Sequence, residues 1–149
     1  MRRIELVAAL PAPADAAWAV FIDTARWPEW GRLVRSAEGE FEPGRRWTMT
    51  LRPERGDLPR VLRPRFVALG PGSRVVFETV VGAAWAVRMV HTFEVLADGP
   101  EASILRQTFS TTGLLVRPLW PRLAAGMHQF DAVGDDLAAR LAEPARARR

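Results

Sequence analysis

Several residue types are missing from this chain of 149 residues, and each absence excludes something. The chain contains no cysteine, lysine, asparagine or tyrosine. Without cysteine it cannot form a disulfide framework, a thiolate nucleophile or a zinc–thiolate site, and a reducing compartment is permitted. No apolar run approaches the ~18 residues that a membrane-spanning helix requires. We therefore expect a cytoplasmic protein with no membrane span.

The absence of lysine changes how the positive charge is interpreted. All 21 basic residues are arginine, the net charge is +4, and the pI is about 11.2, values that suggest a nucleic-acid partner. However, the missing residue types share AT-rich codons, so a GC-rich genome explains the composition without any ligand. The arginines are also scattered along the chain, whereas a nucleic-acid face needs clustered charge beside exposed aromatic residues. We expect no nucleic-acid partner.

The first ten residues suit a β-strand better than a secretory signal. Ile4, Leu6 and Ala8 alternate with Arg3, Glu5 and Val7, as in a strand with one buried face. Glu5 interrupts the apolar stretch, which is too short for the core of a signal peptide. Further along, turn residues separate alternating segments and predict strands near 37–42, 45–52, 60–69, 73–81, 84–96 and 102–112.

Helical patterns flank this strand-rich region. Residues 14–21 follow Pro13, which a first helical turn tolerates, and Asp23 is placed to cap a second short turn ending near Trp27. Residues 117–142 carry an apolar stripe at helical spacing and predict one long helix. Its opposite face, which we expect in solvent, carries the following polar residues: Arg122, His128, Gln129, Asp135, Asp136 and Arg140.

Together these segments predict an α+β fold. Strands without intervening helices favour antiparallel hairpins, so we expect a curved antiparallel sheet of about seven strands wrapped around a long C-terminal helix, with two short helices after the first strand. We expect residues 1–143 to form a single domain and residues 144–149 to form a basic, disordered tail.

This order of elements resembles the START-like (SRPBCC) superfamily with the helix-grip fold, and within it the polyketide cyclase/dehydrase and lipid-transport type. The most specific part is a helix bearing Pro13 and Trp18, followed by Asp23, the Trp27-Pro28 pair and Trp30. The resemblance covers residues 4–141. It implies a cavity between the sheet and the terminal helix that holds an apolar or aromatic small molecule, but it implies no particular activity.

Strand alternation predicts which side chains face that helix. We expect an interior of large apolar side chains with two polar ones, His91 and Gln107, while Trp18 and Trp27 serve core packing. Arg63 and Arg65, beside a proline, are expected to point outward. The predicted ligand-binding residues are Trp30, Trp47, Met49, Phe77, Trp85, Val87, Met89, His91, Phe93, Gln107, Phe109, Met127 and Phe130.

His91 is the most informative single residue. It falls between Met89 and Phe93 on an apolar face, where burial should favour the neutral imidazole. One interpretation makes it a ligand hydrogen-bonding group or a catalytic acid/base. The other makes it a core histidine, satisfied by a backbone carbonyl or by Gln107. Since the second histidine, His128, is predicted on the far side of the helix, we expect no metal site.

Two functions remain open. The first is binding of a hydrophobic or aromatic small molecule, for transport, sequestration or sensing. The alternative is a polyketide cyclase or dehydratase that uses the same cavity, with His91 as acid/base and the best catalytic candidate. No cofactor is expected in either case, and the chain is expected to be a monomer or a homodimer.

Overall fold

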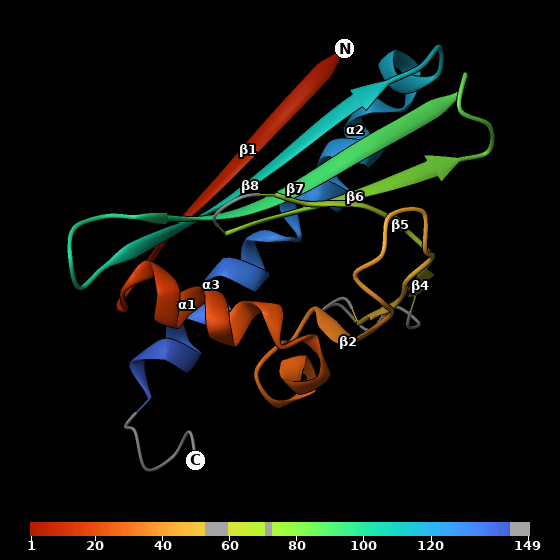
Figure 1. The fold of residues 1–149 in the computed structure, drawn as a ribbon. Helices are drawn as coiled ribbons and strands as arrows, with labels where there is room; N and C mark the ends of the chain where they lie inside the picture. The colour runs from red at the N-terminus through yellow and green to blue at the C-terminus, as the bar shows by residue number, and fades with distance from the viewer. Residues whose placement is uncertain (53–59, 71–72, 144–149) are drawn as a thin grey trace.

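A computed structural model describes residues 1–52, 60–70 and 73–143 and has the predicted α+β fold (Figure 1). The main sheet has five antiparallel strands in the order β1-β8-β7-β6-β5. The strands are β1 (Arg2–Leu10), β5 (Arg65–Gly70), β6 (Arg74–Val81), β7 (Val87–Ala97) and β8 (Ser103–Thr112). The N-terminal segment is thus a strand, as predicted.

A second, three-stranded sheet has the order β2-β3-β4, with β2 (Val34–Glu38), β3 (Thr48–Leu51) and β4 (Arg60–Leu62). The predicted single strand over 60–69 is wrong, because Pro64 separates β4 from β5 and the two belong to different sheets. Proline has no amide hydrogen to donate to a ladder, so it favours such a break. A bridge between Arg46 and Arg65 links the sheets. The strand predicted near 37–42 begins and ends earlier, as β2.

Two short helices connect the sheets, as predicted. Helix α1 (Ala14–Ile22) begins directly after Pro13, and the 3-10 helix η1 (Thr24–Glu29) follows. The predicted side-chain cap of Asp23 is wrong: the carbonyl of Asp23, not its carboxylate, accepts a hydrogen bond from the Arg26 amide at 3.1 Å. Trp27 is buried, and its Nε1 donates to the carbonyl of Phe21 at 2.7 Å, which confirms its role in the core.

The outer face of the main sheet carries the charges. Arg63 and Arg65 are both exposed, as predicted. Arg65 donates to the Glu78 carboxylate at 2.7 Å, and Arg88 pairs with the same carboxylate. Burial raises the pKa of Glu78, but the hydrogen bonds from the two arginines more than offset it, so the pKa lies below its usual value.

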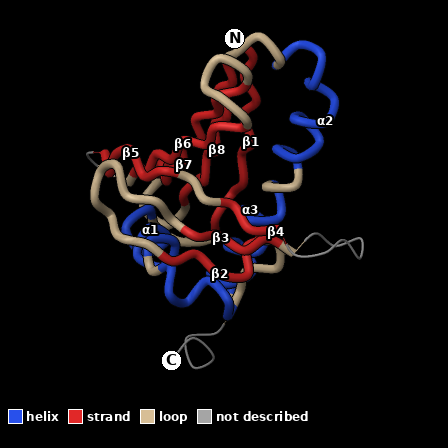
Figure 2. The backbone as a smooth tube through the Cα atoms, turned by 90° about the vertical axis from the view of Figure 1, so that its right-hand side faces the viewer, coloured by secondary structure: helices blue, strands red, loops and turns tan. Residues whose placement is uncertain are grey.

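The C-terminal segment is helical but divided, which corrects the prediction of one continuous helix. Helix α2 (Val116–His128) and helix α3 (Asp131–Ala142) are joined by a tight turn in which the Phe130 amide donates to the Met127 carbonyl at 3.0 Å. Figure 2 shows α2 beside β1 at one edge of the main sheet. Because of this turn, the two helices can pack against the sheet at different distances.

Helix α3 packs closely, whereas α2 does not. A Cβ at Gly134 of α3 would overlap the Cβ of Ala8 on β1, and Leu137 is fully buried. On α2, only Val116 and Met127 are buried. The predicted solvent position of Asp136 is wrong: its carboxylate is buried and accepts hydrogen bonds from the amide and the Nε of Arg32, at 2.7 and 2.6 Å.

Candidate functional site

A polar relay lies on the inner face of the main sheet. Nε2 of His91 on β7 is 3.1 Å from Oε1 of Gln107 on β8, and the Gln107 amide nitrogen donates to the carbonyl of Phe130 at 2.9 Å. Because that carbonyl can only accept, the amide is oriented with its oxygen towards His91. That oxygen also can only accept, so His91 carries its proton on Nε2 and keeps a lone pair on Nδ1.

Aromatic rings enclose His91. Its ring stacks on Phe109 with centroids 3.9 Å apart, lies 4.0 Å from Phe93, and meets the edge of Phe130 at 4.9 Å. Burial lowers the pKa of His91 to about 3, although the hydrogen bond with Gln107 raises it slightly. The imidazole is therefore neutral near pH 7, as the apolar neighbours in the sequence indicated.

The inner face is not equally closed along its length. His91 and Met89 on β7 keep part of their surface in contact with solvent, and so do Ile4 on β1 and Trp120 and Leu123 on α2, which pack against the core. We call these five residues the α2 strip. Farther along the sheet, Phe93 and Gln107 are almost fully buried. The residues of the α2 strip are therefore less completely buried than the neighbouring core residues Phe93 and Gln107.

Most residues predicted to line the pocket are buried in the core. Trp47 is the clearest case: it is 0% exposed, its Nε1 donates to the Glu40 carbonyl at 2.9 Å, and its ring packs 5.4 Å from Phe77. The predicted site residues that are buried in this way are Trp47, Met49, Phe77, Val87, Phe93, Gln107, Phe109, Met127 and Phe130.

Trp85 is the clear exception, and its predicted inward position is wrong. It lies in the turn between β6 and β7 and is 65% exposed. The alternation of β7 was extended two residues too far, because the strand begins only at Val87. Conversely, Ile4, Trp120 and Leu123 were absent from the predicted site, although strand alternation and the apolar stripe of the helix had marked two of them.

Trp30 lies apart from the α2 strip. It lines a surface hollow of about 160 Å³ with Ala19, Val20, Asp23, Arg26 and Arg140. Within the described part of the chain, its Nε1 is one of two buried polar side-chain atoms that have no hydrogen-bond partner. The predicted site residues therefore occupy three places: the core with the α2 strip, this hollow, and the exposed turn.

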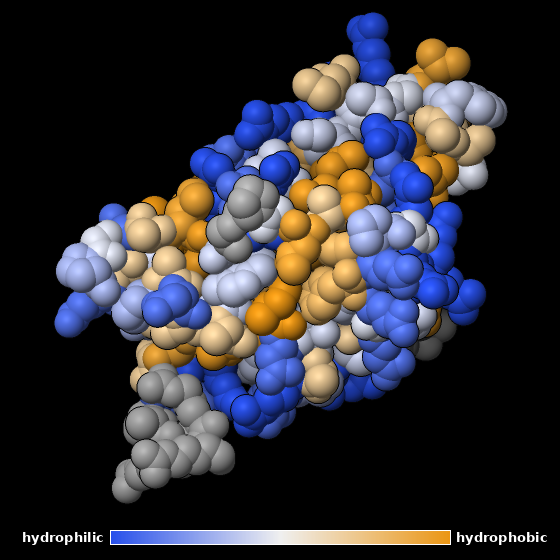
Figure 3. Space-filling view, in the orientation of Figure 1, coloured by the Kyte–Doolittle hydropathy of each residue, from blue (hydrophilic) through white to orange (hydrophobic). Residues whose placement is uncertain are grey.

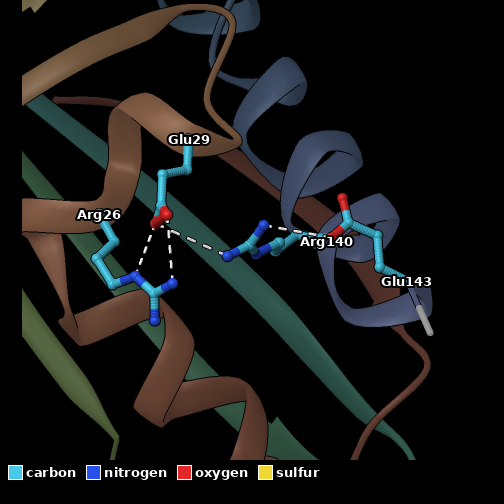
Figure 4. A network of polar contacts seen from close by, with 4 residues as sticks. All are labelled: Arg26, Glu29, Arg140 and Glu143. Carbon is cyan, nitrogen blue, oxygen red and sulfur yellow. Dashed lines mark hydrogen bonds and ion pairs between the residues drawn. The ribbon is translucent and has the colours of Figure 1, made fainter. Parts of the chain in front are cut away.

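An ion-pair network borders this hollow (Figure 4). The Glu29 carboxylate forms an ion pair with the Arg26 guanidinium at 2.7 Å and lies 3.7 Å from the Arg140 guanidinium. Arg140 also forms an ion pair with the Glu143 carboxylate at 3.2 Å. The hydrogen bond from Arg26 lowers the pKa of Glu29. The Arg140 side chain is only 12% exposed, so its predicted place on the solvent face is wrong. Since carboxylates already neutralise these arginines, we interpret the network as a structural link between η1 and α3.

Three further observations complete the description of the surface and its chemistry. A second hollow, of about 290 Å³, is bordered by η1 and β2 and contains no predicted site residue. Among the residues that the structure describes, no group of three or more histidine, aspartate or glutamate side chains could hold a metal ion. Over the same residues, every helix is too short or too polar to cross a bilayer.

Comparison with known proteins places these features in a family. The family model described as polyketide cyclase / dehydrase and lipid transport matches residues 1–143. No curated protein matches the chain.

Solved structures share the fold. Norcoclaurine synthase from Thalictrum flavum is 17% identical, with 96% of this chain and 94% of that chain covered and a TM-score of 0.72. The Zhui aromatase/cyclase from Streptomyces sp. R1128 is 14% identical, with 94% and 93% covered and a TM-score of 0.67. A START superfamily protein from Mycobacterium smegmatis is 12% identical, with 93% and 96% covered and a TM-score of 0.67.

Proposed function

This chain belongs to the polyketide cyclase / dehydrase and lipid transport family, and we propose that it binds a hydrophobic or aromatic small molecule between α2 and the main sheet. The observation that carries the proposal is the α2 strip, where side chains of the sheet and of the helix pack against the core but keep part of their surface in contact with solvent. A ligand inserted there would remove this apolar surface from water.

The energetics permit useful affinity without charged contacts. Burial of ~200 Å² of apolar ligand surface contributes on the order of 5 kcal/mol before entropic losses. His91 adds selectivity, because its Nδ1 lone pair can accept a hydrogen bond from a hydroxyl or amine of the ligand. The stacked Phe109 ring and the Gln107 hydrogen bond hold the imidazole in one orientation. A preorganised acceptor costs little entropy when a ligand binds.

A catalytic role for His91, in a cyclase or dehydratase, is less well supported. With its pKa lowered to about 3, His91 is neutral near pH 7 and has no imidazolium proton to donate. The neutral ring is also a weak base at that pKa. Loss of turnover of a polyketide-like substrate in His91→Phe, with ligand binding retained, would favour the enzymatic alternative.

Two matched probes test the binding proposal. 2-Naphthol can donate a hydrogen bond to His91, whereas 2-methoxynaphthalene has nearly the same apolar surface and cannot. We expect the wild-type chain to prefer 2-naphthol by about tenfold, the value of one buried hydrogen bond, and His91→Phe to lose the preference. Isothermal titration measures both affinities. Native mass spectrometry of the purified protein searches in parallel for a co-purified natural ligand.

A variant pair on α2 supplies the control. Leu123→Trp fills the α2 strip and should weaken both probes, whereas Ala125→Trp places the same side chain on the exposed face of α2 and should weaken neither. Probe affinities that do not respond to Leu123→Trp would exclude this site. Equal affinity for the two probes in the wild type would remove His91 from ligand recognition.

A further inference from the structure

Five large apolar side chains are exposed together at one end of the main sheet. Trp85 is 65% exposed, Leu114 is 78% exposed, and Val80, Val81 and Leu115 are also exposed. They come from the end of β6, the β6–β7 turn and the β8–α2 connection, which lie near the N-terminus in Figure 1. We call these five residues the apolar tip. Exposed large apolar side chains that gather at one end of a protein indicate an interaction surface.

The structure holds the tip together by main-chain hydrogen bonds. The Leu114 amide donates to the Trp85 carbonyl at 2.8 Å, and the Leu115 amide donates to the Ala86 carbonyl at 3.0 Å. Gly113, with φ +129°, allows this approach because a Cβ there would overlap the Ala86 carbonyl. The side chains are therefore presented on a fixed platform formed by two crossing turns.

The charge around the tip is positive. No aspartate or glutamate occurs between Glu78 and Glu94 or between Glu101 and Asp131, so the elements that form the tip lack acidic residues. Nearby on α2, the exposed Arg117 and Arg122 have no carboxylate partner within the described part of the chain. The side chain of Arg2, paired in register with the end of β8, lies over the Trp120 ring at 5.0 Å and likewise has no ion pair there.

We propose that the apolar tip docks on an anionic membrane surface. An exposed tryptophan beside leucine and valine suits the headgroup region, where an aromatic ring lies at the boundary between water and hydrocarbon. The surrounding arginines suit anionic headgroups, and each contributes about a fivefold increase in binding near such a surface. Figure 3 shows hydrophobic side chains directly beside strongly hydrophilic ones at the corresponding upper right end of the molecule.

The exposed apolar side chains and the arginines of the apolar tip disfavour other binding partners at this surface. A nucleic-acid surface would not gain from exposed leucine and valine, because base stacking needs aromatic platforms. A second copy of this chain would place one arginine-bearing tip against another, and like charges would repel. The proposal is independent of the ligand under α2, since attachment to a membrane can be measured without one.

Vesicle co-sedimentation tests the proposal. We expect the wild-type chain to partition at least about tenfold more strongly onto phosphatidylcholine vesicles containing about one-third phosphatidylglycerol than onto pure phosphatidylcholine. Raising the salt from about 0.1 to about 0.5 M should reduce that binding, because counterions screen the surface. The double variant Trp85→Ser/Leu114→Ser and the double variant Arg117→Glu/Arg122→Glu should each reduce it by about tenfold or more.

Matched controls separate the tip from general properties of the surface. Val61→Ser/Leu69→Ser removes two apolar residues that are exposed elsewhere, at 53% and 52%, and Arg60→Glu/Arg74→Glu makes the same charge change away from the tip. Both should bind like the wild type, and thermal unfolding should show that all four variants are folded. Equal binding to both vesicle types, or equal losses in the control variants, would overturn the proposal. A concentration-dependent dimer that the tip variants abolish, without vesicle binding, would assign the surface to a second copy and overturn it too.

Discussion

Helices α2 and α3 occupy the same side of the protein and follow one another in the chain, but they pack in opposite ways. Helix α3 buries Leu137 completely and lies so close to β1 that Gly134 has no room for a side chain. Helix α2 leaves Trp120 and Leu123 partly exposed. We therefore expect α3 to contribute more to the stability of the fold than α2, which is the helix beside the proposed ligand site.

The polar relay lies at the boundary between these halves. Gln107 binds the carbonyl of Phe130 at the turn where α2 gives way to α3, and it also orients His91. Movement of α2 away from the sheet could thus occur with α3 and the relay in place. We expect the two helices to respond differently to equivalent substitutions.

The largest difference is expected from a leucine pair. Leu137→Ala should lower the free energy of unfolding by about 3–4 kcal/mol, because it leaves a cavity in closed core. Leu123→Ala should cost only about 1 kcal/mol, since that side chain is already partly exposed. Urea denaturation measures both. Similar losses in the two variants would contradict the contrast between the helices.

A pH effect should distinguish His91, the partly exposed histidine at the boundary. The pKa of His91 is lowered to about 3 in the folded state and lies near 6.5 when the chain is unfolded. As the pH falls below about 6.5, His91 becomes protonated in the unfolded state but stays neutral in the folded state, so the free energy of unfolding decreases. Between pH 8 and pH 5 this term amounts to about 2 kcal/mol.

His91→Phe should therefore show a flatter dependence of unfolding free energy on pH over that range, even though loss of the bond to Gln107 lowers its stability overall. His128→Gln replaces the exposed histidine of α2 and should retain the wild-type profile. Parallel profiles for the wild type and His91→Phe would show that His91 is not held neutral.

The smallest effects, of opposite sign, are expected from the two helical glycines. Gly134→Ala should destabilise by about 1–2 kcal/mol, because its Cβ would overlap Ala8 and force α3 away from β1. Gly126→Ala on α2 should stabilise by about 0.5–1 kcal/mol, because a Cβ there meets nothing within 4 Å and alanine favours a helix. Melting temperatures should thus move in opposite directions; a loss in both variants would show that α2 is as tightly packed as α3.

Local patterns in the sequence predicted much of the fold. Alternation placed Phe77, His91, Phe93 and Phe109 on one face of the sheet, and all four lie there. The order of strands and helices predicted the family. These predictions succeeded because side-chain direction in a strand or helix depends only on neighbouring residues.

Other predictions failed where distant segments meet. Asp136 and Arg140 were assigned to solvent from helical position alone, yet Arg32 and Glu29, about a hundred residues earlier, cover them. Trp85 was assigned inward because nothing local showed that the strand starts after it. The tail at 144–149 lies outside the described residues, and its predicted disorder stays a prediction.

The sequence by itself determined the kind of elements, their order and which face of each is apolar, since these follow from the period of the side chains. Only the tertiary structure decided which apolar side chains fill the core and which stay partly open. That outcome depends on how closely each helix approaches the sheet. Gly134, which contacts Ala8, allows α3 to pack closely against β1, whereas the turn at Phe130 allows α2 to pack less closely.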